Sequence, residues 1–326
     1  MKIAILGAGA WGTALAIHLT PRHQVALWSR NPDQVQRMGQ ERENRRYLPG
    51  CSLPPALKLE SDLSSVWPAA DLLIVAVPAA AFRSILQTVA AQAKPLIWVC
   101  KGLEPGTGKW LDQVAEETLP RMLPRGVLSG PSFAQEVAAG LPAALTLASR
   151  DRDFALQIAS ELHGGSLRIY TSEDVIGVEV GGALKNVMAI AAGISDGLGF
   201  GNNARAALIT RAAAEMARLG AALGGHAETI MGLTGMGDLI LTCTGELSRN
   251  RQVGLKLAQG KPLNEILLEL GHVAEGVNTA REGMRLADRL GVDMPITGAV
   301  KHILFDGLPA RQAVEGLLSR SQKNEN

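Results

Sequence analysis

Short apolar runs alternate with amphipathic stretches through the first half of the chain. The runs are of strand length, and most are continuously apolar instead of alternating between apolar and polar positions, as expected for parallel strands covered on both faces. We predict strands over residues 2–8, 24–29, 72–77, 96–100, 126–130, 144–149 and 167–171. Helical patterns lie between them, for example over residues 11–20, 81–92 and 153–162. This alternation predicts a doubly wound α/β fold with a Rossmann-like parallel sheet.

After about residue 171 the strand-like runs largely end, and patterns rich in Ala, Leu and Met replace them. We predict helices over residues 204–223, 249–259, 263–270, 276–290 and 295–305. In the first of these, Arg211 and Glu215 are four residues apart and are expected to support each other on the surface. The sequence therefore predicts an α/β domain over residues 1–171 and an all-helical domain over residues 172–326.

Charge and composition narrow the possible functions. Thirty-two Lys and Arg residues against 31 Asp and Glu residues give a net charge of +1. This balance argues against nucleic-acid binding, which usually leaves a strongly basic surface. The three cysteines are far apart and form no metal-ligand pattern, so we expect no metal site and a reducing compartment. The first residues run directly into a strand pattern, and the apolar runs are too short for membrane helices. We expect a cytoplasmic protein without an integral membrane segment.

The segment GAGAWG (7–12) has the spacing G-x-G-x-x-G between the first predicted strand and the first predicted helix. That context gives each glycine a function in dinucleotide binding. Gly7 is expected to make the tight turn, and Gly9 to let the backbone approach a pyrophosphate. Gly12 is expected to allow close helix–strand packing, with the helix N-terminus facing the anion. An ordinary glycine-rich turn is the alternative.

Arg30 stands at the end of the second predicted strand, where NAD-binding proteins usually carry an acidic residue for the ribose. A guanidinium cannot accept a hydrogen bond from a 2′-hydroxyl but pairs well with a 2′-phosphate. Ser29 can add a hydroxyl group. A solvated arginine is the alternative, and Asp33 lies close enough in sequence to serve a ribose hydroxyl. NADP(H) is therefore favoured, with NAD(H) also compatible.

Several polar residues are expected where such a sheet binds ligands, at the carboxyl ends of its strands. Lys101 closes one strand, and Gly130 and Ser132 follow another; Ser132 can also cap the next helix. In the helical half, Asp238 lies between a glycine-rich turn and an apolar run. The run Ser248, Arg249 and Asn250 opens a predicted helix and offers the mixed donors that a phosphate needs. A solvated helix start and a turn carboxylate are the structural alternatives.

Lys185 follows two adjacent glycines, Gly181 and Gly182, in an otherwise apolar helical pattern. Each glycine costs about 1 kcal/mol in a helix interior, so we expect them to expose backbone to a ligand or to the facing domain. A buried lysine whose pKa falls toward about 7–8 can give a proton to a ketone that receives a hydride. Burial and a second cation such as Lys101 would lower the pKa of Lys185. Asn186 is expected to orient the substrate or the cofactor. The alternative is a lysine that extends to solvent.

Taken together, these segments resemble the NAD(P)-dependent glycerol-3-phosphate dehydrogenases of the bacterial type. The resemblance extends in order over nearly the whole chain, through GAGAWGTALA (7–16), VCKGLEP (99–105), LSGPSFAQEV (128–137), GVEVGGALKNVMAIAAGISDGL (177–198), NARAALITR (203–211), GLTGMGDLILTCT (232–244), SRN (248–250) and MPI (294–296). The GGALKN and GDLILTCT stretches are far more specific than the glycine fingerprint. Ala10 stands where serine is common in the family, and Ala274 where valine is common.

The resemblance implies reversible, NADPH-preferring reduction of dihydroxyacetone phosphate to sn-glycerol 3-phosphate for phospholipid synthesis. By the same resemblance, Lys185 is the proton donor and acceptor. The implied substrate residues are Lys101, Gly130, Ser132, Lys185, Asp238, Ser248, Arg249 and Asn250. The implied cofactor residues are Gly7, Gly9, Ala10, Trp11, Gly12, Arg30, Lys101, Ala134, Arg249, Val273 and Glu275.

Two alternatives to this function remain. A related two-domain dehydrogenase would act on a hydroxy acid, and a redox-sensing module would bind a dinucleotide without turnover and have no need of Lys185. The hydroxy-acid dehydrogenase differs from the main hypothesis in its substrate. The redox-sensing module differs from it because its function would not depend on Lys185. A homodimer is expected.

Overall fold

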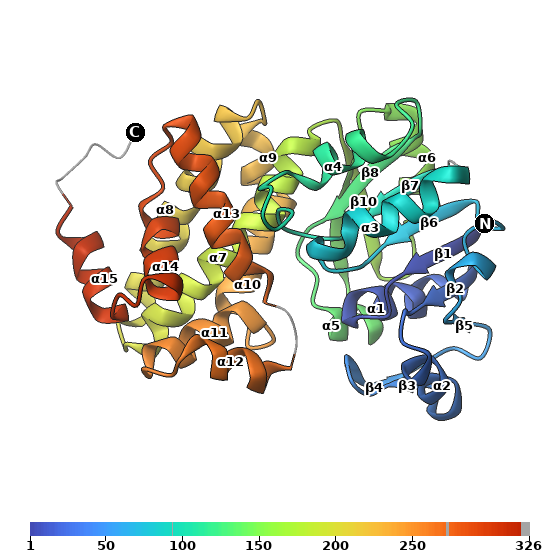
Figure 1. Cartoon of the computed structure of the whole chain (residues 1–326), viewed down its shortest axis with the longest axis horizontal. Coiled ribbons are helices and arrows are strands. Elements are labelled where there is room, and N and C mark those ends of the chain that lie inside the picture. Colours follow the sequence, from blue (N-terminus) through green and yellow to red (C-terminus); the bar gives the residue numbers. More distant parts are fainter. Residues whose placement is uncertain (93, 272–273, 321–326) are drawn as a thin grey trace. The chain divides into compact units, whose positions relative to one another are not determined.

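The computed structural model describes residues 1–320 apart from residues 93 and 272–273. The chain forms two compact units, which are drawn in Figure 1. Unit 1 comprises Met1–Glu104 and Lys109–Glu179, and unit 2 comprises Pro105–Gly108 and Val180–Asn326. The main division thus lies at Glu179, inside a helix, whereas the sequence pattern placed it at residue 171.

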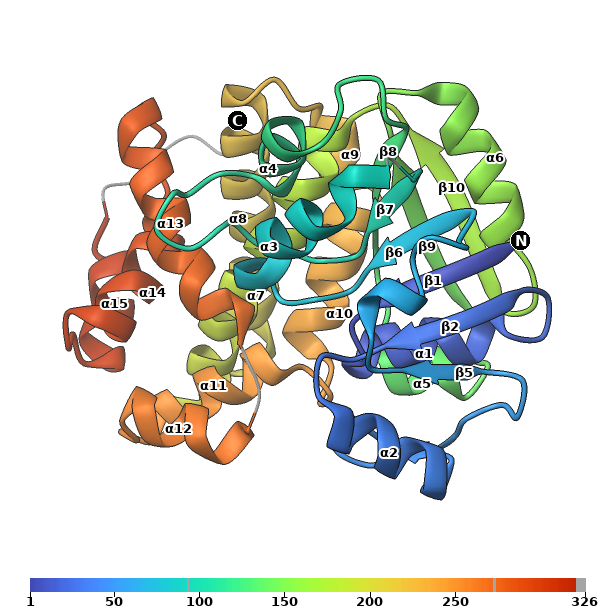
Figure 2. The same cartoon turned by 45° about the vertical axis from the view of Figure 1, so that its right-hand side comes forward.

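Unit 1 is built on an eight-stranded sheet in the order β10-β9-β8-β7-β6-β1-β2-β5, which can be followed in Figure 2. Its strands are β1 (Lys2–Leu6), β2 (Gln24–Trp28), β5 (Lys58–Glu60), β6 (Leu72–Val75), β7 (Leu96–Trp98), β8 (Arg125–Ser129), β9 (Ala143–Ala148) and β10 (Leu167–Ser172). All seven strands predicted from the sequence are present; β5 was not predicted. A two-stranded antiparallel sheet of β3 (Glu43–Asn44) and β4 (Leu48–Ser52) was also not predicted.

The expectation of a wholly parallel sheet is wrong at one place, because β9 runs antiparallel to β8. The other neighbouring pairs in the sheet are parallel. The helix between β8 and β9, α5 (Ala134–Ala138), has five residues. Five residues make a helix of about 7.5 Å, too short to carry the chain back along a strand of about 17 Å. The chain therefore enters β9 from the end at which β8 finishes.

Helices cover both faces of the sheet. They are α1 (Ala10–Leu19), α2 (Pro32–Glu41), α3 (Ala79–Val89), α4 (Leu111–Thr118), α5 and α6 (Arg152–Leu162), with short 3₁₀ turns at Leu63–Ser65 and Ala90–Gln92. Alternate residues of β1 enter opposite cores: Ile3 and Ile5 pack in one cluster, and Ala4 and Leu6 in the other. Burial on both faces explains why the strand reads as a continuous apolar run.

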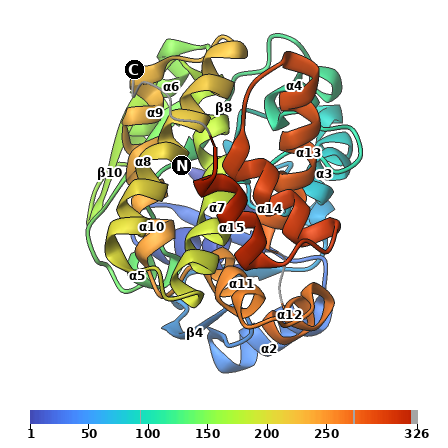
Figure 3. The same ribbon diagram turned by 90° about the vertical axis from the view of Figure 1, so that its left-hand side faces the viewer.

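The described residues of unit 2 after the division contain only helices and turns. The helices are α7 (Val175–Gly197, which begins in unit 1), α8 (Gly201–Ala222), α9 (Ala227–Met231), a π-helical turn η3 (Leu233–Gly237), α10 (Asp238–Thr244), α11 (Arg249–Ala258), α12 (Leu263–Leu270), α13 (Glu275–Leu290), α14 (Pro295–Phe305) and α15 (Ala310–Leu318). Val187, Ile190 and Ile194 of α7 share one core cluster with residues of α11 to α14, and Figure 3 shows these helices around α7.

Among the described helices, α7 is long and apolar enough to cross a membrane by length and composition, but 89% of its most apolar window is buried inside the structure. That burial is the pattern of a core helix.

The predicted surface pair of Arg211 and Glu215 is not formed. Glu215 is 1% exposed, and its carboxylate accepts hydrogen bonds from the backbone N–H of Ile296 (2.5 Å) and Thr297 (3.2 Å). It therefore caps the N-terminus of α14, because the first N–H groups of a helix have no partner within the helix. Burial raises the pKa of Glu215, and the hydrogen bonds from α14 act in the opposite direction.

Candidate functional site

The glycine loop of unit 1 has the backbone geometry that a dinucleotide needs. Gly7 has a φ of +127°, and a Cβ there would meet the Ala76 carbonyl oxygen at 2.5 Å. A Cβ on Gly12 would lie 2.0 Å from the Gly7 carbonyl oxygen, so the helix can approach the turn only with glycine at that position. By contrast, a Cβ on Gly9 would meet nothing within 4 Å. The loop is thus closed by glycines on the protein side and open at Gly9, which suits an incoming pyrophosphate.

Ala10, Trp11 and Ala134 lie around this loop. Ala10 is the first residue of α1, and Gly9 is its N-cap. Trp11 is half-buried and packs against apolar clusters that include α1 and α5. Ala134 is the first residue of α5, which packs on α1. The structure therefore brings these predicted cofactor residues into one region of unit 1.

At the end of β2, Ser29 and Arg30 are arranged differently. Ser29 is buried, and its hydroxyl donates to the Gln34 Oε1 atom at 2.9 Å. Arg30 is exposed and makes no hydrogen bond or salt bridge with any residue in the described ranges. Asp33 is exposed in the first turn of α2. Among the candidates for reading the adenosine end, Arg30 thus presents a guanidinium that the described protein leaves available.

Lys101, Gly130 and Ser132 meet at the carboxyl ends of β7 and β8. The Gly130 carbonyl oxygen accepts from the Lys101 Nζ atom at 3.3 Å and from the Ser132 hydroxyl at 3.1 Å. Gly130 has a φ of +140°, and a Cβ there would lie 3.0 Å from the Ala144 carbonyl oxygen. The hydroxyl of Ser132 does not cap α5, whose N-cap is Phe133. These residues form a polar group of unit 1 at the sheet edge where ligands of such folds bind.

Lys185 of unit 2 is buried in a specific cluster. Its Nζ atom donates to the Asp238 Oδ1 atom and to the Thr242 Oγ1 atom, each at 2.9 Å. The side chains of Lys185 and Asp238 are 11% and 2% exposed. Asp238 begins α10, and Thr242 follows one turn later, so both face α7. The Thr242 hydroxyl lies 2.6 Å from the Asp238 carbonyl oxygen, to which it donates while accepting from lysine.

A carboxylate at 2.9 Å stabilises the positive charge of the Lys185 ammonium and fixes its direction. The partner found within unit 2 is therefore an anion, whereas the sequence suggested a second cation. Thr242 belongs to the GDLILTCT stretch but was not singled out from the sequence. Its spacing of four residues from Asp238, which places both side chains on one face of a helix, is the signal that would have identified it.

Gly181, the first of the two glycines before Lys185, has a different purpose from the one expected. A Cβ on Gly181 would lie 2.6 Å from the Thr234 carbonyl oxygen. The missing side chain thus makes room for η3 of the same unit, and not for a ligand. Gly235 within η3 is equally constrained, because a Cβ there would lie 1.9 Å from the Ile230 carbonyl oxygen. This close packing of η3 on α7 places Asp238, the next residue after the turn, beside Lys185. Single π-helical turns are frequent at functional sites.

In the SRN run, Ser248 and Asn250 make hydrogen bonds within the protein, whereas Arg249 is exposed. Ser248, at the start of the helix predicted over residues 249–259, is the N-cap of α11, and its hydroxyl accepts from the Arg251 N–H at 3.2 Å. Asn250 is buried, donates to the Asn186 Oδ1 atom at 2.9 Å and accepts from the Gly276 N–H at 3.1 Å. It therefore ties the start of α11 to the residue after Lys185.

Arg249 is the exposed member of the run, at the first position of α11. The protein around its guanidinium lowers the pKa of Arg249 by desolvation, and the charge of Glu275 acts in the opposite direction. Arg249 and Glu275, both among the predicted cofactor residues, thus lie near each other in unit 2. Val273, which was assigned with them, lies outside the described residues.

Asp196 is a further residue near this run that the sequence did not single out. Its carboxylate accepts from Arg205 at 2.7 Å and from two guanidinium nitrogens of Arg251, at 2.7 and 2.9 Å. Asp196 thereby fixes Arg251, two residues after Arg249, to the end of α7. Its position in the ISDGL segment carried no chemical signal by itself.

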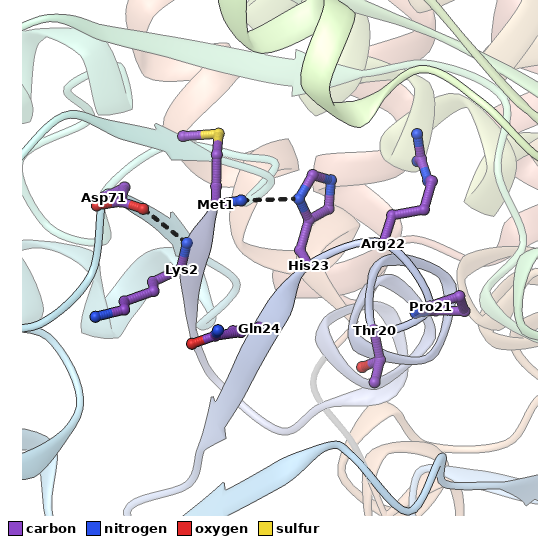
Figure 4. A pocket seen from close by; sticks show the side chains of 8 residues that line it. All are labelled: Met1, Lys2, Thr20, Pro21, Arg22, His23, Gln24 and Asp71. Carbon is purple, nitrogen blue, oxygen red and sulfur yellow. Dashed lines mark hydrogen bonds between the residues drawn. The ribbon is translucent and has the colours of Figure 1, made fainter.

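A cavity of about 450 Å³ lies at the amino end of β1, the end away from the glycine loop. It is lined by Met1, Lys2, Thr20, Pro21, Arg22, His23, Gln24 and Asp71. Figure 4 shows that the Lys2 and Arg22 side chains point in different directions. Arg22 donates to the carbonyl oxygens of Leu162 and His163. Because its cations do not converge, we assign no ligand to this cavity.

Comparisons with known proteins agree with these observations. A family model described as the N-terminus of NAD-dependent glycerol-3-phosphate dehydrogenase matches residues 2–155, and the model of the C-terminus matches residues 174–315. A protein of Nitrosomonas eutropha named glycerol-3-phosphate dehydrogenase (NAD(P)+) is 59% identical over 322 residues, which is 98% of each chain. A protein of the same name from Thiobacillus denitrificans is 58% identical over 327 residues, covering both chains completely. A crystal structure of glycerol-3-phosphate dehydrogenase from Coxiella burnetii has a TM-score of 0.94 at 43% identity, over 98% of this chain and 99% of that one.

Proposed function

The chain belongs to the NAD-dependent glycerol-3-phosphate dehydrogenase family, and from this premise we propose that it reduces dihydroxyacetone phosphate to sn-glycerol 3-phosphate with a preference for NADPH. Family membership makes the chain an NAD(P)-dependent oxidoreductase of the glycerol-3-phosphate dehydrogenase type. The direction of the reaction, the cofactor preference and the use of the product in phospholipid synthesis are the proposed part. Unit 1 is the proposed cofactor-binding domain, and unit 2 carries the proposed catalytic residue.

The observation that carries the proposal is the buried Lys185 ammonium, held by Asp238 and Thr242 at 2.9 Å each. Burial of a lysine is costly unless its charge is paired, so a cluster of this kind at the end of a π-helical turn supports a chemical role. A surface lysine with only a solubility function would need neither the carboxylate nor the hydroxyl.

In the proposed mechanism, the bound nicotinamide cofactor supplies the hydride for the ketone carbon. Lys185 donates a proton to the ketone oxygen as negative charge develops there, which lowers the barrier by general acid catalysis. Asp238 keeps the ammonium aligned and stabilises its charge before the transfer. In the reverse direction, the neutral Lys185 amine takes the proton from the C2 hydroxyl of sn-glycerol 3-phosphate.

Arg249 is the proposed ligand of the substrate phosphate. It lies at the first position of α11, where backbone N–H groups without helical partners also favour an anion. The side chains of Ser248 and Asn250 are hydrogen-bonded within the protein. In this proposal Ser248 therefore fixes the first turn of α11, which carries Arg249, and Asn250 fixes Asn186, the residue after Lys185. Lys101, Gly130 and Ser132 are the proposed substrate contacts from unit 1.

Arg30 supports the preference for NADPH, because its exposed guanidinium follows β2 at the position that meets the adenosine ribose in such folds. A fork of N–H donors there pairs with a 2′-phosphate and has no equivalent partner on NADH. Gly7, Gly9, Ala10, Trp11 and Gly12 are the proposed contacts of the rest of the dinucleotide, together with Ala134, Val273 and Glu275.

The test is the oxidation of NADPH and of NADH by the purified protein, followed at 340 nm with dihydroxyacetone phosphate as the substrate and with a 2-keto acid as the comparison. We expect turnover with dihydroxyacetone phosphate and a higher kcat/KM for NADPH. Turnover with the keto acid alone would refute the substrate, and equal kcat/KM values for the two cofactors would refute the preference. Light scattering after size exclusion tests the proposed homodimer, and cell fractionation tests the proposed cytoplasmic location.

A further inference from the structure

A buried polar network lies directly beneath the glycine loop of unit 1. The Ala8 carbonyl oxygen accepts from the Gln34 Nε2 atom at 2.8 Å and from the Asn44 Nδ2 atom at 3.0 Å. Asn44 also donates to the Thr13 Oγ1 atom at 2.8 Å. Gln34 is 8% exposed, Asn44 1% and Thr13 0%. Two amide side chains from separate elements, α2 and β3, thus converge on one backbone carbonyl of the loop.

We propose that Gln34 and Asn44 are positioning residues of the dinucleotide site, which lock the Ala8–Gly9 peptide so that the Gly9 N–H faces the pyrophosphate. A trans peptide directs its C=O and its N–H to opposite sides. With the Ala8 oxygen held toward the two buried amides, the Gly9 N–H must point away from them. A Cβ at Gly9 would meet nothing within 4 Å, so space is open next to this peptide.

The fixed orientation of the Ala8–Gly9 peptide favours the binding of an anion. If this peptide turned over, the Ala8 oxygen would face the anion and repel it, and one N–H donor of the loop would be lost. A carbonyl oxygen has two lone pairs, and both are engaged by donors here. Reversal would leave two buried amide groups without their acceptor, which is unfavourable.

Gln34 also connects this peptide to the end of the sheet that meets the adenosine ribose. Its Oε1 atom accepts from the Ser29 hydroxyl at 2.9 Å, and Ser29 directly precedes Arg30. The same oxygen of Ser29 lies 3.3 Å from the Asn31 N–H, which donates to it. One chain of hydrogen bonds thus joins the residue before Arg30 to the glycine loop. The inference rests on the proposed function only in requiring that unit 1 binds a dinucleotide.

The test uses two near-isosteric variants that remove the donors, Gln34→Met and Asn44→Leu, in the full chain. The NADPH Kd is measured from the change in cofactor fluorescence, and kcat and the KM for dihydroxyacetone phosphate are measured at saturating NADPH. We expect the Kd to rise roughly fivefold to tenfold in each variant, on the scale of a lost hydrogen bond, with kcat and the substrate KM within about twofold of wild type. NADH binding is expected to weaken by the same factor, because the pyrophosphate is common to both cofactors.

Thr20→Val is the matched control. The Thr20 hydroxyl donates to the Ala16 carbonyl oxygen at 2.6 Å within the protein, at the other end of α1. This variant therefore loses a buried hydrogen bond on the same helix without touching the glycine loop. We expect its Tm to fall while its NADPH Kd stays at the wild-type value.

Two results would overturn the inference. One is an unchanged Kd in both amide variants when their Tm falls as in the control, which would leave the network a purely structural role. The other is a loss of kcat equal to the loss of cofactor affinity. If either variant does not fold, Gln34→Glu retains the shape and the Ser29 partner but places a carboxylate oxygen against the Ala8 oxygen, and the same Kd increase is expected. If the wild-type chain binds neither cofactor, the proposed function fails instead.

Discussion

Replacing Glu179 by glutamine is expected to remove a loss of stability that unit 1 undergoes as the pH rises. Glu179 is buried at the start of α7, where it accepts from the Trp98 Nε1 atom at 3.0 Å and from the Asp112 N–H at 3.1 Å. The pKa of Glu179 is raised from 4.5 to about 8, mainly by burial and in addition by the charge of Asp112, whereas the two hydrogen bonds and Arg150 act in the opposite direction. A glutamine oxygen can accept both hydrogen bonds and carries no charge.

The sign follows from which state holds the proton. Between pH 4.5 and 8 the folded chain keeps Glu179 protonated while the unfolded chain releases the proton, so unfolding becomes easier as the pH rises. The stability from this group is complete below pH 4.5 and is lost by about pH 8. One pKa unit corresponds to about 1.4 kcal/mol, so the difference between Glu179→Gln and wild type can grow by up to about 5 kcal/mol over that interval.

The five tryptophans all lie in unit 1, so their fluorescence follows the unfolding of this unit alone. Urea titrations of both proteins at pH 5, 6, 7, 8 and 9 give the free energy of unfolding at each pH. We expect the stability of Glu179→Gln relative to wild type to rise with pH up to about pH 8 and then to level off. Glu117→Gln is the control, because hydrogen bonds from Lys109 and Arg83 lower the pKa of the exposed Glu117, and its trend is small and opposite. A difference for Glu179→Gln that does not change with pH would refute the reasoning.

Four further substitutions test the proposed site. Lys185→Ala is expected to lower kcat by about 100-fold or more with little change in NADPH binding, and a loss below about tenfold would remove it from proton transfer. Gly12→Ala places a Cβ 2.0 Å from a carbonyl oxygen of the loop, so we expect lost cofactor binding in fluorescence titrations and a cost of about 1–3 kcal/mol in stability; wild-type affinity would contradict the tight turn. Arg30→Asp should move the ratio of kcat/KM values from NADPH toward NADH, and an unchanged ratio would exclude a 2′-phosphate contact. Arg249→Ala should raise the KM for dihydroxyacetone phosphate by roughly 10- to 100-fold but not that for dihydroxyacetone; equal changes for both would show that Arg249 does not hold the phosphate.

The hydrophobic pattern identified most of the elements that carry the site. Residues of β1 alternate between two cores, and the resulting continuous apolar run is visible in the sequence without any tertiary information. The glycine loop was equally predictable, since a positive φ at Gly7 and the close approach at Gly12 are demands that few residue types can meet. Ser248 as the N-cap of α11 was predictable for a related reason. Few residue types cap a helix, and the cap is a contact between residues that are near in sequence.

The direction of β9 was not predictable from its own residues, because a buried strand has the same apolar pattern whether its neighbour is parallel or antiparallel. Glu215 shows the same limit for a charged residue. Its spacing from Arg211 suggests a surface pair, but the N-terminus of α14, 81 residues away, supplies its true partners. Gly181 was recognised as a place where backbone must be exposed, and only the packing of η3 shows what occupies the space.

The sequence by itself determined which residues belong to the glycine loop, which helix carries Lys185 and which residue can cap α11. These are properties of residue type and of spacing within one element. Only the tertiary structure decided that Asp238 and Thr242 hold Lys185, and that Gln34 and Asn44 hold the Ala8 carbonyl. The physical reason is that a hydrogen bond depends on positions a few ångströms apart, and the packing of separate elements sets those positions for residues that are distant along the chain.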